Sequence, residues 1–185
     1  MTKTALVPIA DGTEEIEAVC IIDVLRRAGV AVTVASVNRL QITASRGVKL
    51  VADRLIADCV DESYDAVVLP GGMPGAAHLR DSVPLGEILK RQDRSGRIFG
   101  AICAAPAVVL QHGGLLKNRH ATAHPGFFDQ LDPEYAVATR VVVDGKCITG
   151  RGPGTAIEFA LKLVSLLFDE EKAREVAAPM IVEWE

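Results

Sequence analysis

Short apolar runs rich in β-branched residues alternate along the chain with longer stretches whose apolar positions recur at helical spacing. The strand-like runs cover residues 3–10, 30–37, 64–69 and 97–102. Strands that alternate with helices form a parallel sheet with helices on both faces. The pattern therefore predicts a doubly wound α/β fold with a mostly parallel sheet.

The first predicted helix lies between the first two strand-like runs and has clear signals at both ends. Thr13 is placed to cap its N-terminus, and Glu14 and Glu15 suit the positive end of the helix dipole. Arg26 and Arg27 suit its last turn. These signals define both ends of the predicted helix.

The last third of the chain has a different order of elements. Residues 140–149 have the pattern of a β-hairpin, residues 155–168 that of a long apolar helix, and residues 169–179 that of a charged helix. No linker or repeat interrupts the series. We therefore expect a single domain over residues 1–185, with the charged helix as a C-terminal addition.

Composition and charge narrow the choice of partners. The 20 Lys and Arg residues against 24 Asp and Glu give a formal charge of -4 with no long run of either sign, which argues against nucleic acid. The first apolar run stops at Asp11 and is too short for a signal peptide or a membrane span. Four cysteines without CxxC spacing are typical of reduced thiols. We expect a cytoplasmic protein that contacts neither nucleic acid nor membrane.

The first helix is apolar around almost its whole circumference, since only Glu17 and Asp23 are polar between residues 16 and 25. Such a helix must be covered on more than one side, either by a second subunit or by loops and C-terminal residues of its own chain. We expect the former, a homodimer through this helix. Burial would raise the pKa of Glu17 and keep it protonated near neutral pH, unless the side chain reaches solvent.

Cys103 lies where the strand-like run 97–102 meets the next helix, among small residues. This arrangement is typical of a nucleophile elbow, in which the side chain projects at the carboxyl edge of the sheet. The helix that follows would favour a thiolate, although a free cysteine is often an inert core residue. Gly72 follows the preceding strand at the same edge, where its amide can approach an oxyanion or serve only the turn.

Histidines and glycines supply weaker signals. Pro125 forces His124 out of helical conformation, and beside a reactive cysteine His124 would be a general acid or base, otherwise a surface residue. The glycine-rich residues 150–154 suit either an anion site at a helix N-terminus or a tight turn. No metal-binding, phosphate-binding or dinucleotide motif is present, so neither a metal nor a cofactor is expected.

Several segments together resemble the ThiJ/PfpI superfamily, and best its branch with the human Parkinson-disease protein and bacterial relatives. The resemblance covers nearly the whole chain. The segments that carry it are residues 14–17 (Glu-Glu-Ile-Glu), 69–72 (Leu-Pro-Gly-Gly), 101–106 (Ala-Ile-Cys-Ala-Ala-Pro), 123–125 (Ala-His-Pro), 45–47 (Ser-Arg-Gly) and 151–155 (Arg-Gly-Pro-Gly-Thr).

The resemblance implies a flavodoxin-like sandwich and a homodimer. It also implies a nucleophilic Cys103 paired with protonated Glu17, an oxyanion hole from the amides of Gly72 and Ala104, and His124 near the thiol. Members of this branch are described as glutathione-independent glyoxalases, deglycases of glycated amines and thiols, chaperones and oxidation sensors.

The resemblance also bears on three arginines and on the tail. Arg27 and Arg46 match basic positions near the family's subunit interface, and Arg151 belongs to a matching segment; all three are candidates for anion binding or for the interface. Residues 169–185 resemble the branch's extra C-terminal helix, which protease-like members lack, so proteolysis is less favoured.

Two functions follow as hypotheses. The first is an enzyme in which Cys103 attacks a 2-oxoaldehyde such as methylglyoxal, or a glycated substrate, and Glu17 or His124 moves the proton. The second is a redox-sensing chaperone in which Cys103 is oxidised to a sulfinate. The first is favoured, because a pocket that stabilises an oxyanion serves chemistry directly.

Overall fold

The computed structural model describes residues 2–184 and has a seven-stranded sheet with the strand order β5-β2-β1-β6-β7-β9-β8. All neighbouring strands are parallel except β8, which pairs antiparallel with β9. The doubly wound, mostly parallel fold is confirmed. The elements are β1 (Thr4–Ile9), α1 (Glu15–Arg27), β2 (Ala31–Ser36), β3 (Gln41–Thr43), β4 (Lys49–Val51), β5 (Arg54–Leu55), η1 (Ile56–Cys59), β6 (Ala66–Leu69), α2 (Gly75–Arg80), α3 (Val83–Arg94), β7 (Ile98–Ile102), η2 (Pro106–Gln111), η3 (Pro125–Gln130), β8 (Val141–Asp144), β9 (Cys147–Gly150), η4 (Pro153–Thr155), α4 (Ala156–Leu167), α5 (Glu170–Ala177) and η5 (Ala178–Met180).

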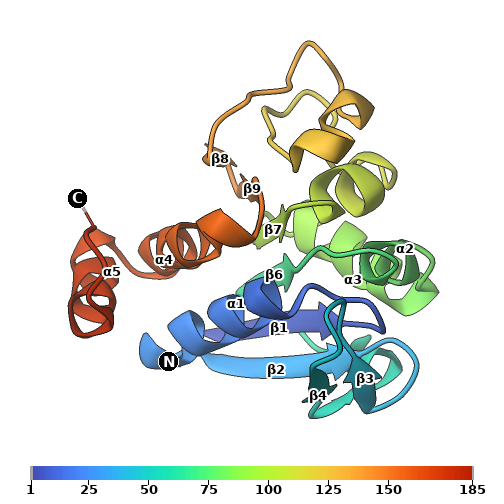
Figure 1. The fold of residues 1–185 in the computed structure, drawn as a ribbon, viewed down its shortest axis with the longest axis horizontal. Helices are drawn as coiled ribbons and strands as arrows, with labels where there is room; N and C mark the ends of the chain where they lie inside the picture. Colours follow the sequence, from blue (N-terminus) through green and yellow to red (C-terminus); the bar gives the residue numbers. More distant parts are fainter. Residues whose placement is uncertain (1, 185) are drawn as a thin grey trace.

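Two apolar cores lie on the two faces of the sheet. One consists of residues from the sheet together with α1, α4 and α5, and the other joins the sheet to α2, α3 and η2. Figure 1 shows α4 and α5 at one side of the molecule and α2 and α3 at the other. Alternate side chains of each buried strand supply both cores, as a parallel sheet covered on both faces requires.

Helix α1 is covered partly by its own chain. It packs against α4, and four of its apolar side chains are buried: Ala18, Ile21, Val24 and Leu25. Ile16 and Val19 remain 53% and 47% exposed. The C-terminal helices therefore account for one side of this apolar helix, and the homodimer through the other side stays a prediction.

Some local predictions differ from the structure. Glu14, not Thr13, caps α1, because its carboxylate accepts from the amide of Glu17 at 2.8 Å. The Thr13 hydroxyl instead accepts from the amide of Ala10 at 2.9 Å and closes the turn after β1. The helix expected after Cys103 is present as a π-helix of six residues, Pro106–Gln111.

The helices α4 and α5 and the hairpin of β8 and β9 agree with the sequence pattern to within about two residues, the usual uncertainty of element ends. Across residues 2–184, no helix is both long enough and apolar enough to cross a membrane.

Candidate active site

Cys103 directly follows β7 and has a backbone φ of +65°, a left-handed conformation that few residues other than glycine adopt. Two hydrogen bonds hold it there: its amide donates to the carbonyl of Gly150 at 2.9 Å, and its carbonyl accepts from the amide of His124 at 2.8 Å. The side chain is only 8% exposed, yet it lines a surface cavity. The strand-to-helix elbow predicted from the small neighbours is therefore present.

Glu17 approaches Cys103 from α1 and is completely buried. Its Oε2 accepts from the amide of Gly71 at 2.7 Å, whereas Oε1 is buried without a regular hydrogen-bond partner. Burial raises the pKa of Glu17 to about 7, and the hydrogen bonds from Gly71 and from the Cys103 thiol oppose the rise. The carboxyl can thus gain or lose a proton near neutral pH, next to a thiol.

The Cys103 thiol holds its proton more firmly than the sequence suggested. Burial, and then the charge of Glu17, raise the pKa of Cys103 to about 12, although the amides of Gly72 and Ala104 lower it. Burial and the Glu17 charge therefore oppose the thiolate expected from the sequence, whereas the two amides favour it. The thiol and the carboxyl of Glu17 are hydrogen-bond partners, so a proton can pass between them.

Close backbone packing brings these groups together. A Cβ on Gly71 would lie 2.7 Å from the Cβ of Cys103, and one on Gly72 would lie 2.4 Å from the amide nitrogen of Glu14. Gly75 is equally tight against Thr13. Only glycine lets the chain after β6 pass between α1 and the elbow, which is why the Gly72 amide reaches the sulfur.

The cavity in front of the thiol has a volume of about 380 Å³. It brings together four of the residues expected from the sequence, namely Cys103, Gly72, Ala104 and His124, and one of the arginines, Arg46. Sequence reasoning assigned no role in the site to the other lining residues, which are Glu14, Ser45, Met73, Phe127 and Pro153.

His124 lies at the exposed mouth of this cavity. Its Nδ1 accepts from the amide of Gly126 at 3.1 Å, so in the neutral ring the proton resides on Nε2. His120, by contrast, lies at the surface beside Asp144. Of the two alternating histidines, only His124 reaches the site.

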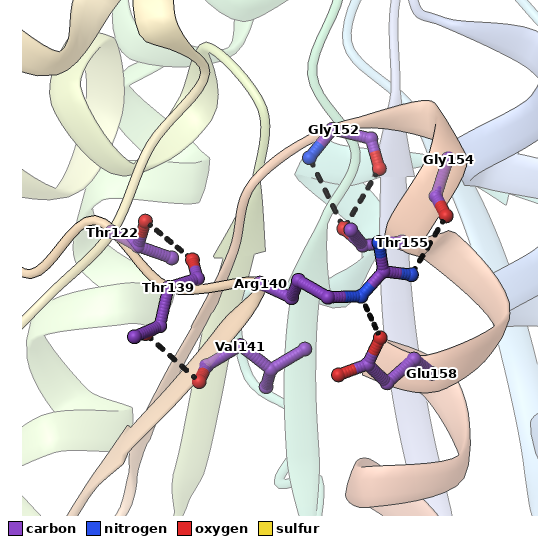
Figure 2. A network of polar contacts seen from close by, with 8 residues as sticks. All are labelled: Thr122, Thr139, Arg140, Val141, Gly152, Gly154, Thr155 and Glu158. Carbon is purple, nitrogen blue, oxygen red and sulfur yellow. Dashed lines mark hydrogen bonds and ion pairs between the residues drawn. The ribbon is translucent and has the colours of Figure 1, made fainter.

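Polar contacts fix the segment that carries His124. The amide of Thr122 donates to the hydroxyl of Thr149 at 2.9 Å. The Thr122 hydroxyl donates to the carbonyl of Thr139 at 2.9 Å, as Figure 2 shows. In the same view, Arg140 donates to the carbonyl of Gly154 at 3.1 Å. These contacts support the walls of the cavity near His124 and Pro153.

Residues 150–154 form a tight turn, and an anion site at this turn stays a prediction. Gly152 and the Thr155 hydroxyl exchange hydrogen bonds at 3.2 and 2.9 Å (Figure 2). Arg151 lies outside the lining of the cavity, with its guanidinium 5.7 Å from the centre of the Phe128 ring and a buried Nη1 that has no partner. Arg27 pairs with Asp23 at 2.5 Å on the exposed surface of α1.

Another cavity, of about 510 Å³, lies between α4 and the C-terminal residues. Its described lining contains no cysteine or histidine, so the chemistry concentrates at the smaller cavity. Nowhere in residues 2–184 do three metal-ligating side chains cluster in a way that would hold an ion.

Fold and site together define a class of protein: a flavodoxin-like α/β domain with a cysteine on a strand-to-helix elbow beside a buried carboxyl. The sequence profile of the DJ-1/PfpI family matches residues 3–166, and the chain belongs to this family.

Known proteins show how this chain relates to the family. Protein DJ-1 homolog B of Arabidopsis thaliana is 48% identical over 183 residues, which are 98% of this chain but 42% of that protein. The chain thus spans less than half of that relative's length. The glutathione-independent glyoxalase DJR-1.2 of Caenorhabditis elegans is 36% identical over 182 residues, 96% of each chain. The solved structure of oxidized Toxoplasma gondii DJ-1 has a TM-score of 0.98 and 47% identity, covering 99% of this chain and 100% of that one.

Proposed function

We propose that the protein is a cysteine-dependent, glutathione-independent enzyme for 2-oxoaldehydes, converting methylglyoxal to lactate. The observation that carries the proposal is a thiol in the wall of a cavity, with a buried carboxyl of pKa about 7 behind it and two amides that donate to the sulfur. The Caenorhabditis elegans relative named as a glyoxalase supports the same chemistry.

In the first step, Sγ of Cys103 adds to the aldehyde carbon while the carboxylate of Glu17 takes the thiol proton. The new carbon–sulfur bond gives a hemithioacetal, and the carbonyl electron pair moves onto oxygen. The amides of Gly72 and Ala104, which point at the sulfur in the free site, are placed to donate to that oxygen. Coupling the proton transfer to the attack removes the need for a free thiolate.

In the second step, a proton moves between the two substrate carbons through an enediol. A base removes the proton from the former aldehyde carbon, and an acid returns one to the neighbouring carbon, which leaves a thioester on Cys103. Glu17, buried behind the thiol, and His124, which lines the cavity, are the groups that we assign to these transfers. Water then hydrolyses the thioester to lactate and regenerates the thiol.

Glutathione-free turnover of purified methylglyoxal tests the proposal. We expect the wild type to form lactate and Cys103→Ala to form none above the uncatalysed rate. Full turnover by Cys103→Ala would exclude this mechanism.

Deglycation of early glycated amines and thiols begins with the same groups. An adduct carries the aldehyde carbon as a hemithioacetal or aminocarbinol, and the thiol would displace the bound amine or thiol. Steady-state kinetics on free methylglyoxal and on a pre-glycated amino acid, in buffers that do not scavenge aldehyde, separate the two activities. A higher kcat/KM for the adduct at equal free aldehyde favours deglycation.

Oxidation sensing is a second candidate, favoured by the oxidized Toxoplasma gondii relative. Two molecules of peroxide would convert the Cys103 thiol to a sulfinic acid with release of two waters, and protonated Glu17 would donate to the sulfinate. Peroxide titration read by intact mass tests it. Selective gain of two oxygens at Cys103 supports sensing, whereas oxidation spread over all four cysteines argues against it.

The proposed homodimer rests on the exposed apolar side chains of α1. Sedimentation of the wild type and of Ile16→Lys tests it, with a two-fold mass for the wild type and a shift towards monomer for the variant. A wild type that sediments as a monomer would exclude the dimer. A cytoplasmic location stays a prediction.

A further inference from the structure

The turn between β3 and β4, residues 44–48, forms one wall of the Cys103 cavity. It is closed by two backbone hydrogen bonds, from Ala44 to Val48 at 2.8 Å and from Gly47 to Ala44 at 3.0 Å. Ser45 and Arg46 from this turn line the cavity. The turn belongs to a separate two-stranded sheet, so the main sheet does not fix its position.

Glu15, the first residue of α1, fastens this turn. Its Oε2 accepts from the hydroxyl of Ser45 at 2.8 Å, and its Oε1 accepts from the amide of Arg46 at 2.8 Å. The amide of Ser45 adds a bond to the carbonyl of Thr13 at 2.8 Å. The carboxylate is 7% exposed, and both of its oxygens are satisfied by the turn.

The charge state of Glu15 agrees with this geometry. Burial raises its pKa, but hydrogen bonds from Ser45 and from the amides of Glu15, Arg46 and Val48 outweigh burial, so the net pKa lies below the ordinary value. A charged acceptor strengthens each of these bonds. Glu15 therefore stays ionised near neutral pH while Glu17, two residues along the same helix, does not do so fully.

We infer that Glu15 is a positioning residue, which holds residues 44–48 against α1 so that the Arg46 cation and the Ser45 side chain form a wall of the substrate cavity. Three carboxyl groups at the N-terminus of α1 thus have different roles. Glu14 caps the helix, Glu15 holds the turn, and Glu17 serves the thiol.

The position of the Arg46 cation can be measured without enzymatic turnover. A cation held at the cavity favours an anionic reagent over a neutral one of the same shape. The ratio of Cys103 alkylation rates by iodoacetate and by iodoacetamide therefore reports where Arg46 lies, and Arg46→Gln sets the value without the cation.

The variant Glu15→Gln keeps one acceptor oxygen for the Arg46 amide, replaces the other oxygen by a donor on the side of the Ser45 hydroxyl, and removes the negative charge that strengthens both bonds. We expect the iodoacetate-to-iodoacetamide ratio to fall about threefold, towards that of Arg46→Gln, as for a partly solvated charge interaction. The iodoacetamide rate itself should stay within about twofold, because Glu17 and the two donor amides are untouched. Hydrogen exchange of the Arg46 amide should accelerate by about tenfold or more.

The kinetic part of the inference rests on the proposed function. For methylglyoxal, Glu15→Gln should raise KM by about tenfold and leave kcat nearly unchanged, because the cavity wall and not the reacting pair is displaced. If the wild type shows no turnover, the proposed function fails, yet alkylation and hydrogen exchange still decide the role of Glu15.

Two further variants test whether the effects of Glu15→Gln arise from a general loss of folding. Ser45→Ala removes one of the two contacts, and the alkylation ratio should move in the same direction by less. Glu170→Gln is the matched control. It removes the carboxylate of the first residue of α5, which pairs with Lys162 and is distant in sequence from Glu15, so it should change none of the measured quantities. An unchanged ratio in Glu15→Gln, or equal loss of both alkylation rates, would overturn the inference.

Discussion

Cys103 and Cys147 are both buried thiols whose pKa is raised to about 12, yet they lie in different surroundings. Cys147 is the first residue of β9, pairs in the sheet with Phe99, and is 2% exposed. Burial raises its pKa, and the Arg119 cation lowers it. Cys103 lies just beyond the carboxyl end of the neighbouring strand, beside Glu17 and a cavity.

The pKa of the resting thiol therefore does not distinguish a nucleophilic cysteine from a cysteine in the apolar core. What differs is the route for the proton and the access for a substrate. Glu17 titrates near neutral pH next to Cys103, while Cys147 has no hydrogen-bonded carboxyl partner among the described residues. Reactivity in this fold depends on position at the carboxyl edge of the sheet.

The largest expected effect is the loss of the reactive thiol. Cys103→Ala should lower kcat/KM for methylglyoxal by about a thousandfold or more, since no other group can form the covalent adduct. Cys147→Ala is the matched control and should keep full activity, with a loss of unfolding free energy of about 1 kcal/mol. Comparable activity losses in both variants would break the contrast between the two thiols.

The second-largest effect is expected from removing the proton acceptor, Glu17. Glu17→Gln should lower kcat/KM by about a hundredfold, the usual contribution of a general base, because the amide still accepts from Gly71 but cannot take the thiol proton. Circular dichroism and sedimentation should match the wild type.

The pH profile of the same pair checks the role of Glu17. In the wild type, kcat/KM should rise with pH and level off above about 7, where the carboxylate is formed. This inflection should be absent in Glu17→Gln. An inflection near 7 that persists in the variant would assign the titration to another group.

Burying Glu17 also has a stability effect with a defined sign. Its folded-state pKa of about 7 exceeds the ordinary 4.5, so the folded protein binds more protons between these values and its stability falls as pH rises through that window. The shift corresponds to about 3 kcal/mol. The free energy of unfolding of Glu17→Gln relative to wild type, measured in urea, should therefore rise by up to about this amount between pH 4 and pH 8. A difference that does not change with pH would contradict the raised pKa.

The smallest expected effect concerns His124 at the cavity mouth. His124→Gln should lower kcat by about tenfold, since a partly solvated acid–base group can be replaced in part by water. His120→Gln, at the surface beside Asp144, is the control and should leave kcat unchanged. Equal effects of the two substitutions would remove His124 from the mechanism.

The fold was predictable because its strands and helices carry strong periodic patterns. The long apolar run of α4 and the clear end signals of α1 identified both segments as helices. The hairpin of β3 and β4 and the short helix α2 were missed, because three-residue strands and a six-residue helix are too short to show a period. Tertiary contacts decide such segments.

The site was predictable in its groups and less so in its electrostatics. The small residues around Cys103 and the apolar ring around Glu17 indicated an elbow and a buried acid, and the structure places both at one edge. The charge state of the thiol could not be predicted, because the net effect of burial, donor amides and a neighbouring carboxyl depends on distances that a sequence does not contain. The contacts of Glu15 with Ser45 could not be predicted either, because only the folded chain brings the turn at residues 44–48 next to α1.

The tight glycines between β6 and α2 set a limit on how this protein can change. With a backbone nitrogen or the elbow cysteine within 3 Å of any added methyl group at Gly71, Gly72 or Gly75, even alanine would push the acid and the sulfur apart. In a saturation library selected for aldehyde resistance, these three codons should therefore return glycine alone.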